Sequence, residues 1–224
     1  MIREYTMKHI FLIFAIIFLL GCGSDDAPTN TNTASRSIAD YMLDGPVGTE
    51  YWYSQVGIRT DTNGRTGILG RDTIVWTILN RAYNHPILGN CMQVTVYRKF
   101  HDYLDTAYYS LSNNEIVYMD RSPGMDRILI GPIEKGTIQN VDDNNNAKIH
   151  ALDVPMTTPA GNFSTVHVLA EEYRENNNEK YTANFYFTPK VLVCKIQRFI
   201  EQSTLTGKKQ LEEYSIELFR IKKP

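Results

Sequence analysis

The sequence predicts an all-β protein, an antiparallel meander that forms a curved sheet, a half-barrel or a sandwich. Apolar and polar residues alternate with the two-residue period of strands along much of the chain. Helical periodicity is almost absent, and 14 tyrosines and 9 phenylalanines favour strands. Similar segments in the two halves indicate that the sheet is built from two duplicated units.

The first segment has the pattern of a secretory signal. Arg3 and Lys8 precede the apolar run Ile10–Leu20, and a charged start followed by a short apolar run is typical of such signals. This run is too short to cross about 30 Å of hydrocarbon as a helix. Met1 and Met7 are both candidate start residues.

The end of this run resembles the recognition site of bacterial lipoprotein signal peptidases. Leu19, Leu20 and Gly21 precede Cys22, which places a small residue directly before a cysteine. The resemblance implies that residues 1–21 are removed and that Cys22 becomes the first mature residue. Its sulfur would carry a diacylglycerol and its amine a third acyl chain, and two or three acyl chains hold a protein stably on a membrane.

The residues after the anchor predict a tether. Gly23 stands where an aspartate would resemble an inner-membrane retention signal, so we expect residence in the outer membrane, on either face. Residues 22–36 contain no large apolar side chain beyond the cysteine, so burial cannot offset the entropy of ordering them. We predict a flexible tether over 22–36 and one β-rich domain over 37–224.

Within that domain one segment has a helical pattern and the others alternate as strands. Ser37 and Asp40 have the spacing of a capping box at the start of Ser37–Leu43, and Gly45–Pro46 ends that segment. We predict strands over Asp72–Asn80, Met92–Tyr97, Tyr108–Leu111, Ile116–Met119, Thr165–Tyr173, Tyr181–Phe187 and Leu211–Ile221. We predict hairpin turns at residues 112–115, 176–178 and 206–208.

Two halves of the chain, residues 44–127 and 130–221, resemble each other. Gly48–Thr49 corresponds to Gly136–Thr137 in similar contexts. The other matching segments are GNCMQVTV (89–96) with GNFSTVHV (161–168), and TAYYSLSNNEIVY (106–118) with TANFYFTPKVLVC (182–194). We interpret the halves as duplicated units, and the alternative is a chance likeness between strands that follow Gly-Asn turns.

Three of these segments are similar to an uncharacterised family of β-rich bacterial lipoproteins. The segments are the entry strand Gly48–Tyr53, the strand start Pro159–Phe163 and the hairpin Tyr186–Lys195. The last matches in part, because Leu192 stands where the family has glycine and the lysine follows Cys194. The resemblance implies a fold and a location, and it carries no known active site.

The remaining cysteines, Cys91 and Cys194, leave two alternatives open. In an oxidising envelope they could form a disulfide. The alternation, however, puts Cys194 on an apolar face with Leu192 and Ile196, whereas Cys91 lies with polar neighbours. We favour two separately packed thiols over the disulfide.

One acidic stretch has part of the pattern of a calcium loop. Asp142, Asn144 and Asn146 alternate, and Asp153 occupies the last ligand position. Ala147 stands where the loop needs a glycine, and the last ligand should be a glutamate. We therefore favour a solvated turn over a metal site.

No motif in the sequence predicts catalysis or a cofactor. Asp102 and Asp105 beside His101 allow an acid–base interpretation, but a polar loop between strands explains them as well. The histidines lack the spacing of a zinc site: His85, His101, His150 and His167. We expect a non-enzymatic protein without a cofactor.

Three functions remain open at this stage. The first is a lipid-anchored envelope protein with a binding or scaffolding β-domain, whose partners are the membrane, through Cys22, and an unidentified envelope protein or ligand. The second is a carrier of a lipid or another apolar ligand, for which an apolar cavity of several hundred Å³ in the concave face would be diagnostic. The third is a hydrolase of envelope polymers, which needs two carboxylates converging within about 5 to 10 Å. The formal net charge of −2 gives no reason to expect nucleic acid.

Overall fold

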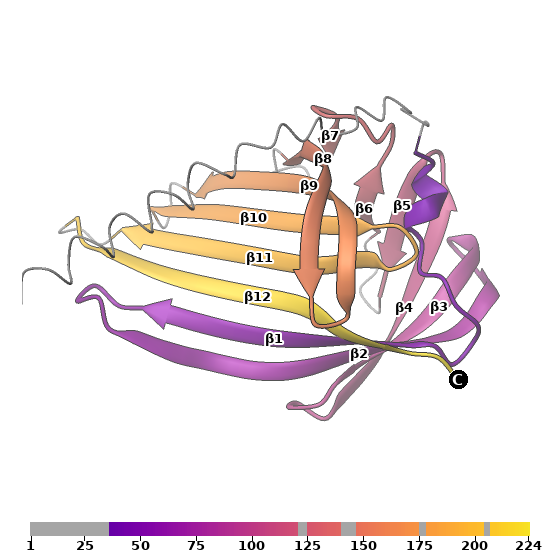
Figure 1. Ribbon diagram of the computed structural model, residues 1–224, viewed down its shortest axis with the longest axis horizontal. Coiled ribbons are helices and arrows are strands. Elements are labelled where there is room, and N and C mark those ends of the chain that lie inside the picture. The colour runs from indigo at the N-terminus through magenta and orange to yellow at the C-terminus, as the bar shows by residue number, and fades with distance from the viewer. Residues whose placement is uncertain (1–35, 121–124, 140–146, 175–177, 204–206) are drawn as a thin grey trace, which may run out of the picture. The chain divides into compact units, whose positions relative to one another are not determined.

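The computed structural model describes residues 36–120, 125–139, 147–174, 178–203 and 207–224 (Figure 1). The unit Ser35–Pro224 contains every element described below. Among the described residues, no helix is long and apolar enough to span a membrane.

The elements are one 3-10 helix and twelve strands. Their bounds are η1 (Ile38–Tyr41), β1 (Glu50–Thr60), β2 (Thr66–His85), β3 (Gly89–Arg98), β4 (Tyr103–Ser112), β5 (Glu115–Met119), β6 (Asp126–Ile130), β7 (Ile138–Gln139), β8 (Ala147–Thr158), β9 (Gly161–Arg174), β10 (Glu179–Thr188), β11 (Leu192–Ser203) and β12 (Lys209–Lys222).

All twelve strands form one antiparallel sheet, so the predicted all-β curved sheet is confirmed. The sheet order is β6-β5-β4-β3-β2-β1-β12-β11-β10-β9-β8-β7, which joins the first strand of the chain to the last (Figure 1). Every residue of β1 has a partner in β12, from Glu50 opposite Lys222 to Thr60 opposite Leu211. Each half of the chain is therefore a meander, and this pairing fuses the two meanders into one sheet.

Each strand predicted from alternation lies within an observed strand. The predicted turn at 112–115 is confirmed as a tight hairpin, in which Asn113 and Asn114 have φ of 48° and 62°. No prediction covered β6, β7 or β8. In β8 the register shifts on both sides of Ala151, and Asp153 has a φ of 55°, so irregular pairing interrupts the alternation there.

The predicted helical segment Ser37–Leu43 forms a single 3-10 turn. The Ser37 Oγ caps it by accepting a hydrogen bond from the Ala39 N–H (3.3 Å). The segment buries Tyr41 and Leu43, together with Ile38, in the core of the sheet, where they are at most 4% exposed. This burial holds the start of the domain against the sheet.

The two halves make matching hydrogen bonds at their Gly-Thr pairs. In Gly48–Thr49, the glycine N–H donates to the Ile78 carbonyl (2.8 Å), and the threonine carbonyl accepts from the Ile78 N–H (3.0 Å). In Gly136–Thr137 the same two bonds join Ile149, at 2.8 and 2.9 Å. The two glycines have φ of 89° and 90°. This correspondence supports the duplication inferred from the sequence, which stays a prediction.

The two edge strands of the sheet, β6 and β7, are joined by one side chain. The Ile130 N–H donates to Gln139 Oε1 and the Gln139 amide donates to the Ile130 carbonyl, both at 2.6 Å. The Gln139 amide thus replaces a pair of backbone hydrogen bonds, and its side chain is fully buried. The sheet therefore curls until its two edges meet. It is a nearly closed half-barrel and not a sandwich, because all its strands belong to one sheet.

We expect Gln139→Leu to lower the free energy of unfolding by about 1 to 3 kcal/mol, because it leaves the Ile130 N–H and carbonyl without their partner. Gln197→Leu is the matched control, since the Gln197 side chain makes no hydrogen bond with the described residues. Urea unfolding of both variants measures the difference. Equal stability of the two variants would show that the amide does not hold the edges together.

Candidate functional site

An apolar cavity of about 290 Å³ lies inside the curled sheet. Strands from opposite parts of the sheet order, β5 and β6 on one side and β9, β10 and β11 on the other, share its wall, so the cavity is on the concave face. Its walls are mostly apolar, with Asp126 and Arg127 as the charged members: Trp76, Tyr118, Asp126, Arg127, Ile128, Val168, Phe185, Phe187, Leu192, Val193 and Ile196. We call this space the apolar cavity.

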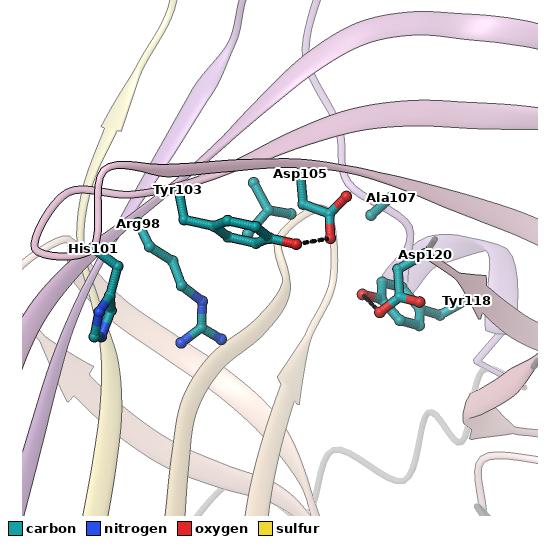
Figure 2. A pocket seen from close by; sticks show the side chains of 8 residues that line it. Arg98, His101, Tyr103, Asp105, Ala107, Tyr118 and Asp120 are labelled. Carbon is teal, nitrogen blue, oxygen red and sulfur yellow. Dashed lines mark hydrogen bonds between the residues drawn. The ribbon is translucent and has the colours of Figure 1, made fainter. Parts of the chain in front are cut away.

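A second space of about 500 Å³ lies beside it, and we call it the polar chamber (Figure 2). Its lining comes from β3, β4 and β5 and from the residues next to them. The lining residues are Val96, Arg98, His101, Tyr103, Asp105, Ala107, Tyr118 and Asp120. Figure 2 shows Arg98 and His101 toward one end of the chamber and Tyr118 with Asp120 toward the other.

The two spaces adjoin each other through shared residues. Tyr118 lines both of them. Val96, in the chamber wall, is also the direct cross-strand partner of Trp76, in the cavity wall. A run of aromatic rings continues from Trp76 through Tyr109 to Tyr118, with centroid separations of 6.1 and 5.4 Å. The apolar cavity and the polar chamber are therefore neighbours on the concave face.

The tyrosines at this junction are neutral hydrogen-bond donors. Burial, together with nearby Asp120, raises the pKa of Tyr118 well above its ordinary value, and burial does the same for Tyr109. Within the chamber, Tyr118 donates to Asp120 and Tyr103 donates to Asp105, both at 3.1 Å. Figure 2 shows Asp105 beside Tyr103 and Asp120 beside Tyr118.

Several residues singled out in the sequence lie outside the described residues, so their predictions stay open. They are Leu19, Leu20, Gly21, Cys22, Asp142, Asn144 and Asn146. Asp153 is described, and its carboxylate pairs with Arg36, which we had placed at the end of the tether, and accepts from Ser164 Oγ (3.0 Å). These contacts engage the carboxylate that would be the last ligand of the suggested calcium loop.

The histidines are spread over the sheet. His101 lines the polar chamber, whereas Asp102 binds the Tyr97 hydroxyl (2.8 Å) and is not among the lining residues. His150 and His167 have ring centroids 5.2 Å apart, and burial lowers the pKa of His167. Among the described residues, no three histidine, cysteine, aspartate or glutamate side chains are grouped as metal ligands.

In the structure Cys91 and Cys194 are free, buried thiols. The Cys91 thiol donates to the Tyr83 carbonyl (3.4 Å) and the Cys194 thiol to the Tyr186 carbonyl (3.5 Å). Burial raises the pKa of Cys91, and it raises that of Cys194 to about 12. Both thiols are packed as neutral groups.

Of the residues that line the two spaces, the sequence singled out His101 and Asp105, as possible acid–base residues, and it did not identify the others as a site. Trp76 and Arg98 lie on the paired strands β2 and β3, whereas the cavity residues of β9, β10 and β11 reach Trp76 only because the sheet curls. One signal was available: Val94, Val96 and Arg98 alternate on the core face of β3, so an arginine continues an apolar face.

Comparisons with known proteins bear on the fold. No family model and no curated protein matches the chain. A crystal structure of a protein described as exported and as having a YmcC-like fold, from Bacteroides fragilis NCTC 9343, is similar at 13% identity. It has a TM-score of 0.50 and covers 81% of this chain and 98% of that one. A protein described as a lipoprotein from Parabacteroides distasonis ATCC 8503 gives 13% identity, coverage of 80% and 97%, and a TM-score of 0.43. The first similarity shows a shared fold.

The raised pKa of Cys194 predicts a loss of stability in alkali. In the unfolded chain this thiol ionises near its ordinary pKa of 9.0, whereas in the folded chain it keeps its proton to about 12. Its contribution to stability is therefore complete below pH 9 and is lost as the pH rises toward 12. Urea unfolding at about pH 8 and about pH 11 should show a smaller fall in stability for Cys194→Ala than for the native protein. An equal fall in the stability of the variant and of the native protein would contradict the claim that the Cys194 thiol is buried and protonated.

Proposed function

We propose that the chain is a lipid-anchored protein of the bacterial cell envelope whose sheet binds an apolar or amphipathic small molecule in its concave face. The observation that supports binding best is the apolar cavity of about 290 Å³ beside the polar chamber. A packed interior would have favoured a scaffold. The proposal therefore selects the ligand carrier from the alternatives open to the sequence.

The cavity has the size and lining of a small-molecule site. Such sites have volumes of about 300 to 1,000 Å³ and walls that are mostly apolar with a few polar groups. A cavity of about 150 Å³ holds benzene, so 290 Å³ has room for about twelve carbon atoms at similar packing. Asp126 and Arg127 stand in the cavity wall, and the other polar residues stand beside it, in the chamber, where they can orient one end of a ligand.

The envelope location is supported by the first residues of the chain. Leu19, Leu20 and Gly21 before Cys22 favour lipidation of that cysteine, and Gly23 favours the outer membrane. The Bacteroides fragilis protein with a similar fold is described as exported, which agrees with this proposal.

Changing the anchor cysteine tests the location. We expect the native protein to fractionate with membranes and to incorporate labelled palmitate, and Cys22→Ser to lose both properties because no acyl chain can be attached. Cys91→Ser is the matched control and should stay in the membrane fraction, since that thiol is buried in β3. Membrane-bound, unlabelled Cys22→Ser would refute lipid anchoring.

Filling the cavity tests the binding. Ile128 lies on β6 in the cavity wall, so Ile128→Trp should weaken binding of the fluorescent probe N-phenyl-1-naphthylamine about tenfold or more. Ile138→Trp adds the same side chain at a position that is 64% exposed and outside the cavity wall, and it should bind like the native protein. Unchanged affinity in folded Ile128→Trp would exclude the cavity as the binding site.

A further inference from the structure

We propose that the ligand is an amphipathic anion with a single negative charge, of the carboxylate class, and that Arg98 binds its charged group. This inference rests on the proposed function, because it names the chemistry of the ligand that the concave face would hold. It comes from an arginine in the polar chamber that has no hydrogen-bond or ion-pair partner among the described residues.

Arg98 has unused hydrogen-bonding capacity. Its side chain is half-buried and lines the chamber, yet it forms no hydrogen bond or ion pair with any residue that the structure describes. A guanidinium carries five N–H donors and is always charged. A half-buried, charged group without a counter-ion among the described residues favours an anionic ligand, and the planar guanidinium suits a carboxylate.

Arg98 stands at a suitable distance from the apolar cavity. On β3 it follows Val96 by two residues on the same face, which is about 7 Å along the strand. Val96 is paired with Trp76 in the cavity wall. A ligand with about ten carbons in the cavity can thus reach Arg98 with a charged group at its end.

The other charged groups of the chamber limit the charge of the ligand. Asp105 and Asp120 also line the chamber and repel a second negative charge, although each accepts a tyrosine hydroxyl. Figure 2 shows Asp120 away from Arg98, toward the other end of the chamber. His101 lies at the Arg98 end and adds a nitrogen donor. We therefore expect a carboxylate to bind more tightly than a dianionic phosphate.

The experiment uses Trp76 as its reporter. Of the two tryptophans, Trp76 lies in the cavity wall, whereas Trp52 packs against Phe219 (ring centroids 6.2 Å apart) and is not among the cavity residues. In a Trp52→Phe background, fluorescence titration compares four probes with the same chain: decanoate, decan-1-ol, decyl phosphate and decyltrimethylammonium. Arg98→Gln removes the charge, and Arg198→Gln is the matched control on β11, outside both spaces.

We expect decanoate to bind at least about tenfold more tightly than decanol, the magnitude of one charge-assisted hydrogen bond. Arg98→Gln should reduce decanoate binding to the level of decanol and leave decanol binding unchanged, which also shows that this variant is folded. Arg198→Gln should keep the preference.

Three results would overturn the inference while leaving the proposed function intact. They are equal binding of decanoate and decanol by the native protein, a preserved preference in Arg98→Gln, and tighter binding of the ammonium or the phosphate. If none of the four probes binds, the proposed function fails as well.

Discussion

The pairing of β1 with β12 is the constraint on which the rest of the structure depends. It joins the two ends of the folded chain along the full length of β1, so two meanders become one continuous sheet. A sheet of this length twists and curls. Because the joint lies in the middle of the sheet order, its edges are β6 and β7, which are close in sequence and meet through the Gln139 amide. Curl and closure together create an inner face on which distant strands share one space.

The inner face of the sheet has an apolar region and a polar region. Near η1 it is packed with buried apolar side chains, among them Tyr41, Tyr53 and Leu218. Next to this core the packing opens into the apolar cavity, and beyond Trp76 and Tyr118 the lining becomes polar. The same sequence feature explains both regions: in β3 the core-facing residues Val94 and Val96 are followed by Arg98. The order of residues along one strand face therefore places a charged group next to apolar ones.

The sequence predicted the fold class and the regular strands, and it did not predict the site. Alternation in β2, β3, β9 and β10 is clear because one face of each strand is buried in the core. It fails in β8, where the register shifts around Ala151, and in β7, which has two residues and is too short to show a period. The Gly48 and Gly136 contexts indicated a repeat, and their hydrogen bonds to Ile78 and Ile149 match. The apolar cavity depends on sheet closure, which no local pattern encodes.

Native mass spectrometry of the protein isolated from its own cells in mild detergent tests the central claim most directly. If the concave face carries a ligand, the native protein will show an additional small-molecule mass, about one per chain, that is lost on denaturation and is absent from a variant whose cavity is filled by Ile128→Trp. If the native protein has only the mass of its lipidated chain, or if the filled variant retains the same additional mass, the concave face is not the ligand site.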